Sequence, residues 1–183
     1  MLVSGAKDTD VIVWDLVAEC GIYRLRGHNG PLVQVRLLET NGMNHLVSAS
    51  KDSIIKIWDL ATQHCVETIV ASRGELWSVE VDQAEDLLVS GGSDPEVRVW
   101  RLDSDAIKAR LSALEDPEPL SSTAEPIAPQ KSLQLYGSIV RQSKDKLGTV
   151  KFHNTGRYLV LQVFIIIQHP LLVKGTSLTP LSP

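Results

Sequence analysis

Apolar and polar residues alternate with a period of two along much of this chain, in short segments separated by turn residues such as Asn41-Gly42 and Lys51-Asp52. Successive side chains of a strand point to opposite faces of a sheet, so this alternation predicts half-buried β-strands. The predicted strands cover residues 22–25, 31–38, 45–50, 54–60, 65–70, 76–81, 87–92 and 96–100. We therefore expect an all-β fold.

Part of this pattern is repeated three times. The repeat carries a Leu-Val-Ser triplet and, later, a tryptophan, which recur at Leu2, Leu46, Leu88, Trp14, Trp58 and Trp100. The tryptophans are 44 and 42 residues apart (58 − 14 and 100 − 58). A period of this length with four short strands is typical of a β-propeller blade. The sequence predicts a partial propeller, with two complete four-stranded blades and partial blades at each end.

With this pattern the chain resembles the WD-repeat family, clearly over residues 1–102 and more weakly to about residue 162. In that family a histidine, a serine or threonine, an aspartate and a tryptophan form a hydrogen-bonded tetrad inside a blade. The resemblance assigns this structural tetrad to His28, Ser48, Asp52 and Trp58. A buried carboxylate beside an imidazole is tolerated when both are hydrogen-bonded, which suits an internal support.

Two other repeats match the tetrad in part. The partial tetrads are Ser4, Asp8 and Trp14 in one repeat and Ser90, Asp94 and Trp100 in the other. The histidine strand of the first set would lie before Met1, and Ala71-Ser72 stands where the other repeat needs Gly-His, so we expect weaker or absent networks there. We reject a hydrolase triad of His28, Ser48 and Asp52, because no G-x-S-x-G turn surrounds the serine.

The repeat pattern divides the chain into parts. Residues 1–102 carry the blades, in which the strand at 22–25 is grouped with the strands of 31–60 and the strand at 65–70 with the strands of 76–100. Residues 103–132 form an acidic insertion, rich in proline and serine, that we expect between blades, with a short helix over Ala106–Asp116. Residues 133–162 regain strand character and are assigned to a partial further blade.

Residues 163–183 form an apolar tail outside the repeat pattern, because no turn aspartate or tryptophan-bearing strand follows Gln162. The apolar run is too short and too interrupted for a membrane span. Gln162-Val163 can be encoded across a splice-donor sequence, so our hypothesis is that the tail is translated intron; a divergent C-terminus is the alternative. We also expect the sequence to be a piece of a larger gene product, or to close its open blade edges by swapping or by association with further blades.

The distribution of charge suggests a candidate binding surface only in the last third of the chain. The formal net charge of −4 provides no general attraction to nucleic acid. Residues 126–183, however, hold seven Lys/Arg against one Asp/Glu. Arg141, Lys144, Lys146 and Lys151 form a basic cluster that is a candidate for weak contact with RNA phosphates. A solvated strand edge explains the same charges and is favoured, because no aromatic residues interleave with them.

The sequence shows no pattern for catalysis or cofactor binding: it has no phosphate-binding glycine loop and no zinc-ligand spacing. The two cysteines, Cys20 and Cys65, are too few for a disulfide scaffold or a metal site, and we interpret them as reduced thiols. We predict a protein that is not an enzyme, without cofactor, bound metal, membrane partner or small-molecule substrate.

A narrower resemblance covers 5–28, 50–70 and 73–81. These segments are similar to the tandem-propeller WD-repeat subunits of the small-subunit processome, which are associated with U3 small nucleolar RNA. The resemblance implies a scaffold in pre-rRNA processing and small ribosomal subunit biogenesis, located in the nucleus and nucleolus. It also implies that the partners are other WD-repeat processome proteins, the U3 ribonucleoprotein and pre-rRNA.

The alternative is a general WD-repeat adaptor, such as a substrate receptor of a ubiquitin ligase. Receptors of that class often carry arginine two residues after Trp-Asp, whereas Val17 and Ala61 occupy those places here. A propeller enzyme is a further rival, which would need a polar or metal-binding cluster in the central channel.

Overall fold

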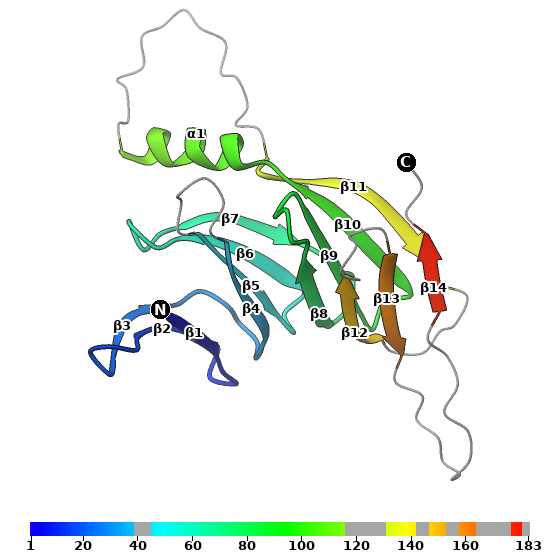
Figure 1. The fold of residues 1–183 in the computed structure, drawn as a ribbon, viewed down its shortest axis with the longest axis horizontal. Helices are drawn as coiled ribbons and strands as arrows, with labels where there is room; N and C mark the ends of the chain where they lie inside the picture. The colour runs from blue at the N-terminus through cyan, green and yellow to red at the C-terminus, as the bar shows by residue number, and fades with distance from the viewer. Residues whose placement is uncertain (39–44, 116–130, 142–146, 153–157, 164–176, 181–183) are drawn as a thin grey trace, which may run out of the picture.

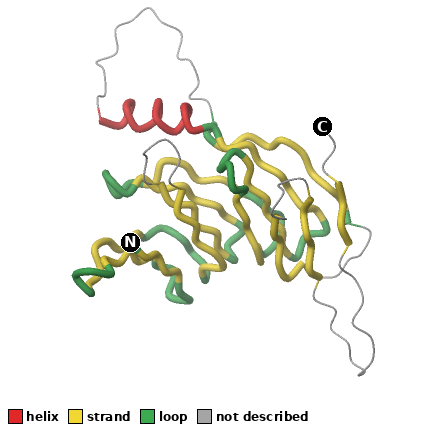
Figure 2. The backbone as a smooth tube through the Cα atoms, in the orientation of Figure 1, coloured by secondary structure: helices red, strands yellow, loops and turns green. Residues whose placement is uncertain are grey.

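The computed structural model describes residues 1–38, 45–115, 131–141, 147–152, 158–163 and 177–180. In this part of the chain, short antiparallel strands form four separate sheets, which follow one another along a row, with helix α1 packed outside them (Figures 1 and 2). The all-β prediction, with two complete four-stranded blades and smaller sheets at either end, is confirmed.

The first two sheets cover the first half of the chain. The first sheet contains β1 (Leu2–Gly5), β2 (Val11–Asp15) and β3 (Cys20–Leu25). The second sheet contains β4 (Leu32–Leu38), β5 (His45–Ser50), β6 (Ile54–Asp59) and β7 (Cys65–Val70). In both sheets the leucine of Leu-Val-Ser stands opposite the tryptophan of the next strand: Leu2 opposite Trp14, and Leu46 opposite Trp58. The sequence repeat is therefore also a repeat of strand register.

The third sheet contains β8 (Leu76–Val81), β9 (Leu87–Gly92), β10 (Glu96–Leu102) and β11 (Leu133–Val140). It keeps the same register, with Leu88 opposite Trp100. The fourth sheet contains β12 (Leu147–Phe152), β13 (Tyr158–Val163) and β14 (Ser177–Pro180). The last of these strands comes from the segment that we placed outside the repeat pattern, although most of that tail lies outside the described residues.

The grouping of the strands differs from the sequence-based expectation at three places. β3 pairs with β2 and completes the first sheet, and β7 pairs with β6 and completes the second sheet, although we had grouped residues 22–25 and 65–70 with the repeat that follows each of them. β11 pairs with β10 along its whole length and completes the third sheet. The insertion before β11 therefore lies within a blade, between its third and fourth strands, and not between two blades. Alternation shows that a segment is a strand, but hydrogen bonding to a distant segment decides its neighbour.

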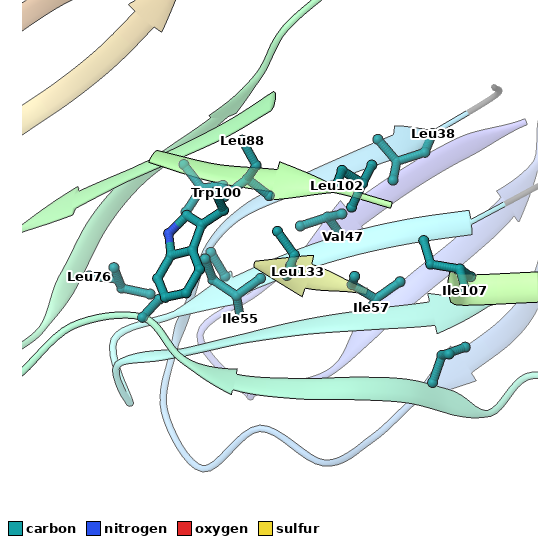
Figure 3. Close-up of a cluster of buried hydrophobic side chains, with 14 residues drawn as sticks. Leu38, Val47, Ile55, Ile57, Leu76, Leu88, Trp100, Leu102, Ile107 and Leu133 are labelled. Atoms are coloured by element: carbon teal, nitrogen blue, oxygen red, sulfur yellow. The ribbon is translucent and has the colours of Figure 1, made fainter. Parts of the chain in front are cut away.

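The core lies between successive sheets. Branched aliphatic residues of one sheet pack against the leucine and tryptophan positions of the next sheet. One cluster joins the first and second sheets through Val11, Val13, Leu25, Leu46, Trp58 and Leu60. A larger cluster joins the second and third sheets and includes Val47, Ile55, Ile57, Leu76, Leu88, Trp100 and Leu102 (Figure 3). Burial of each such side chain contributes about 1.5–3 kcal/mol, so these layers hold the sheets together.

Polar side chains also connect the first strands of successive sheets. The side-chain oxygen of Gln34 on β4 accepts a hydrogen bond of 3.2 Å from the backbone N–H of Val79 on β8. The hydroxyl of Ser78 on β8 accepts one of 3.1 Å from the N–H of Val150 on β12. Gln34 and Ser78 occupy equivalent positions, so the same bridge occurs twice. Each of the two residues comes directly after an irregularity in the pairing of its strand with the next strand.

Helix α1 (Ser104–Glu115) follows β10 and lies across the outer part of the second and third sheets (Figure 1). The carboxylate of Asp103 accepts hydrogen bonds of 3.1 Å from the N–H groups of Asp105 and Ala106, as an N-cap should. Ile107 is buried in the cluster between the two sheets (Figure 3). The helix therefore packs over the boundary between the two sheets. Its position in the sequence agrees with the short helix predicted over Ala106–Asp116.

Candidate functional site

The four predicted tetrad side chains come together in the second sheet. His28 lies in the connection from β3 to β4, Ser48 on β5, Asp52 in the following turn and Trp58 on β6. The Nδ1 atom of His28 lies 3.1 Å from Asp52 Oδ2, and its Nε2 atom lies 2.8 Å from Ser48 Oγ. The indole Nε1 of Trp58 donates to the same Ser48 oxygen at 2.8 Å. The tetrad therefore connects two strands, the turn between them and the segment that leads into β4.

The order of the protons in this network follows from the donors. An indole N–H can only donate and a carboxylate can only accept, so Ser48 Oγ accepts from Trp58 and Nδ1 of His28 carries the hydrogen that it donates to Asp52. Burial of His28 lowers its pKa from the ordinary value of 6.5 despite the neighbouring carboxylate, which favours the neutral imidazole. In a neutral ring with its hydrogen on Nδ1, the Nε2 atom accepts the hydroxyl hydrogen of Ser48.

Asp52 remains ionised within this network. Burial opposes its charge, but hydrogen bonds from the backbone N–H of Asn29, the ring of His28 and the N–H of Ile54 outweigh burial and lower the pKa of Asp52 below 3.8. The bonds from Asn29 and Ile54 are 2.8 and 3.0 Å long. The serine hydroxyl is buried and is fully used by its neighbours, so the geometry suits an internal support and provides no exposed nucleophile.

In the third sheet, the aspartate of the equivalent turn is bound by a different type of side chain. Trp100 donates to Ser90 Oγ at 2.8 Å, as in the second sheet. Asp94, however, receives a hydrogen bond of 2.9 Å from Arg98, whose guanidinium also donates to the carbonyl of Ala71 at 2.9 Å. Here Ser72 occupies the position equivalent to His28. The network that we expected to be weaker or absent thus has a cationic replacement for histidine.

Arg98 is the residue that sequence reasoning missed. It stands two residues before the tryptophan, where the second repeat has Lys56 and the first has Ile12. An arginine at this position of a repeat that has Ala71-Ser72 in place of Gly-His is the signal that could have revealed the exchange. Arginine offers several N–H donors in a fork, so one side chain can reach both the carboxylate and a backbone carbonyl.

The first sheet keeps only part of the network among the described residues. Trp14 donates to Ser4 Oγ at 2.8 Å, which is the bond seen in the other two repeats. Asp8 accepts a hydrogen bond of 3.2 Å from the N–H of Asp10 and therefore supports its own turn. The serine–tryptophan bond is thus the feature that all three repeats share.

Two of the four residues of the predicted basic cluster, Arg141 and Lys151, lie in the part of the chain that the structure describes. The guanidinium of Arg141 donates to the carbonyls of Gly92, Asp94 and Pro95, at 3.4, 2.7 and 3.3 Å, so these donors hold the β9–β10 turn. Lys144 and Lys146 lie outside the described residues. Lys151 is exposed on β12. RNA contact by this cluster stays a prediction.

No group of three or more His, Cys, Asp or Glu side chains suited to a metal ion occurs in the part of the chain that the structure describes. Cys20 is an exposed free thiol and Cys65 a half-buried one. Within the same described ranges, no helix has the length and apolar character needed to cross a membrane.

Comparison with known proteins agrees with this geometry. Residues 20–59 and 63–101 match the family model "WD domain, G-beta repeat". The chain is 30% identical, over 55% of its length, to a p21-activated protein kinase-interacting protein 1-like protein of Danio rerio. It is 33% identical, over 52% of its length, to the nuclear distribution protein nudF of Emericella nidulans. It spans 27% and 21% of these relatives. Residues 20–59 and 63–101 therefore match WD repeats, and the described strands form the blades of a partial β-propeller.

Proposed function

We propose that this chain is a non-catalytic WD-repeat scaffold. The observation that supports the proposal most directly is the use of His28, Ser48 and Asp52, the residue types that general acid–base chemistry needs. All three are engaged in hydrogen bonds that connect strands within one blade. Function on such a platform depends on the loops and rims that the rigid sheets position, and these surfaces bind other macromolecules.

The more specific proposal is a component of the small-subunit processome, acting in pre-rRNA processing in the nucleolus. Its support is the resemblance over residues 5–28, 50–70 and 73–81 described above. In this role the chain would bind other WD-repeat proteins of the assembly and would be connected to U3 RNA and pre-rRNA through them. Lys151 is the exposed basic residue, within the described part of the cluster, that could touch RNA directly.

The second candidate is a general adaptor that binds proteins outside ribosome assembly, such as a ubiquitin-ligase substrate receptor. The relatives favour this class, because one is named for its interaction with a protein kinase and the other for nuclear distribution. Because the chain spans only part of each relative, their partners are candidates and no more for this chain.

Recovery of RNA with the tagged chain tests the two candidates. We expect U3 RNA to be enriched relative to a spliceosomal RNA when the chain is purified from cells. The variant Lys151→Glu should recover the same amount of U3 if the RNA is held through proteins, whereas direct contact would reduce its recovery. Ubiquitin-ligase adaptors or a kinase without U3 would instead support the adaptor, and the absence of all three would contradict both candidates.

A further inference from the structure

The outer strand of the third sheet has an unprotected edge. Among the described strands, β11 pairs only with β10 and stands at the outer end of its sheet (Figure 1). With eight residues it is also the longest strand in the described part of the chain. The backbone N–H and C=O groups on the free side of an edge strand can pair with a further strand. The edge therefore sets the chemical nature of its occupant, which is a polypeptide in extended conformation.

The other outer strands carry features that discourage such pairing. β3 carries Arg24, whose guanidinium lies 3.4 Å from the carboxylate of Asp10. β7 carries Glu67, whose carboxylate accepts a hydrogen bond of 2.7 Å from the N–H of Ser132, and helix α1 packs against this strand. β14 has four residues and ends with Pro180. Charge, proline and cover by a helix are the usual protection of a sheet edge, whereas β11 contains no charged residue and no proline.

The second half of β11 presents an apolar surface. Tyr136 is 64% exposed and Val140 is 71% exposed, and Ser138 between them is exposed as well. These three residues alternate along the strand, so they line one face. Gly137 and Ile139 lie on the other face and are half-buried. A β carbon on Gly137 would meet no atom within 4 Å, so there is open space beside this residue.

The neighbouring sheets leave this edge free. The second sheet packs on one face of the third sheet, through the cluster that includes Ile55 and Trp100. The fourth sheet packs on the opposite face, through the cluster that includes Val97 and Leu147. Both neighbours cover faces, and neither covers the edge. The exposure of β11 is therefore a property of the third sheet and does not depend on the number of sheets in the row.

Two copies of this edge are complementary to one another. When two β11 strands lie antiparallel about a two-fold axis at Ser138, Tyr136 of each copy stands opposite Val140 of the other, and Gly137 stands opposite Ile139. Residues that stand opposite one another in an antiparallel pair share a face. The exposed tyrosine and valine therefore cover each other, and the isoleucine takes the open space beside the glycine. No like charges meet, because the strand is uncharged.

We propose that β11 joins two copies of this chain edge to edge, so that their third sheets form one continuous sheet. The occupant of the edge is the β11 strand of the second copy, in the register centred on Ser138. Such a two-fold interface is isologous, so each contact occurs twice. The dimer describes how the scaffold associates with itself and does not depend on the choice between a processome component and an adaptor.

Sedimentation of the purified 183-residue chain over a range of concentrations tests the dimer. Val140→Lys should weaken association about tenfold or more, because each dimer then brings two ammonium groups against the rings of Tyr136 and the adjoining apolar surface. The matched control is Val70→Lys. Val70 occupies the equivalent position on β7 and is also 71% exposed, and this variant should associate as the parent does. Because both valines are largely exposed, both variants should melt near the parent temperature, which separates loss of the dimer from loss of the fold.

A cysteine at the two-fold axis tests the register. In a chain with Cys20→Ser and Cys65→Ser, the substitution Ser138→Cys places two thiols opposite one another in the dimer. Opposed residues of an antiparallel pair have the separation that a disulfide needs, so mild oxidation with copper phenanthroline should join two copies. The control is Thr68→Cys, at the equivalent position of β7, which should remain a single chain under the same conditions.

Three results would overturn the proposal. The first is a chain that sediments as a monomer at every concentration. The second is equal weakening of association by Val140→Lys and Val70→Lys, because the contact would then not depend on β11. The third is a dimer in which Ser138→Cys forms no more disulfide than Thr68→Cys, because the two strands would then not meet in the proposed register.

Discussion

Arg98 stands two residues before the tryptophan of its repeat, and its guanidinium donates a hydrogen bond of 2.9 Å to the carboxylate of Asp94. In the preceding repeat the equivalent aspartate, Asp52, is held by His28 from a different segment of the chain. Two neighbouring blades thus hold the aspartate of the equivalent turn with different donors. One donor comes from the segment before the blade, and the other comes from the strand that follows the turn. The side chains of Arg98 and Asp94 are 11% and 9% exposed, so neither has ready access to water as a replacement partner.

Replacement of Arg98 by methionine should destabilise the protein strongly. The change leaves Asp94 without its charged partner, and loss of one partner of a largely buried pair costs about 3–5 kcal/mol. Unfolding by urea measures this loss. The double variant Arg98→Met, Ser72→His restores a histidine at the position equivalent to His28 and should recover part of the stability. Equal stability of the single and double variants would contradict the proposed exchange of roles.

Alanine substitutions of the three repeat serines should differ in cost. Ser48→Ala removes the acceptor of Trp58 and the donor to His28, so two buried groups lose a partner. An unsatisfied buried group costs about 1–3 kcal/mol, so we expect roughly 2–6 kcal/mol here. Ser90→Ala should cost about half as much, because only one buried group, the indole N–H of Trp100, loses its partner. Ser4→Ala should cost less than about 1 kcal/mol, because water can reach half-buried Trp14. Denaturant unfolding of the three variants gives the order directly, and equal costs would contradict it.

Stability should fall as the pH is lowered below about 6.5. Burial lowers the pKa of both His28 and His45 below the unfolded value of 6.5. The unfolded chain therefore binds more protons than the folded chain in this range, and the stabilisation present above 6.5 is lost as the pH falls toward the folded pKa values. Each histidine contributes a slope of at most about 1.4 kcal/mol per pH unit. His28→Gln should reduce the slope of the unfolding free energy between about pH 5 and about pH 7, and an unchanged slope would exclude His28 as its source.

Neighbouring glycines of the third sheet should respond differently to alanine. A β carbon on Gly92 would overlap the backbone carbonyl of Glu75, which belongs to the connection before β8 and cannot turn aside easily. A β carbon on Gly91 would meet the end of the Leu147 side chain, which can change rotamer. We expect Gly92→Ala to cost about 3 kcal/mol and Gly91→Ala about 1 kcal/mol. Thermal unfolding of the two variants provides the comparison, and a larger loss for Gly91→Ala would show that the leucine is the rigid neighbour.

The sequence was sufficient to predict the propeller strands, because they depend on local and periodic information, and the resemblance to WD-repeat proteins supplied the tetrad residues. Alternation over 45–50 and 54–60 predicts two strands that share a short turn, and that turn is closed by Asp52. The pairing of β11 with β10 was not predictable in this way. Thirty residues separate the two strands (133 − 102 − 1), and the alternating pattern of β11 fits an outer strand of one blade as well as an inner strand of the next.

The amino-acid sequence by itself determined the period of the repeat, the β-strands and the identity of the side chains that meet in the second sheet. A strand exposes its faces with period two, and the spacing of the tryptophans repeats the whole unit, so these features can be read along the chain. The tertiary structure alone decided which sheet receives β3, β7 and β11, and that Arg98 and Arg141 act within turns. Each of these depends on contacts between segments far apart in the chain, where long side chains and unpaired strand edges have several partners within reach and packing selects one of them.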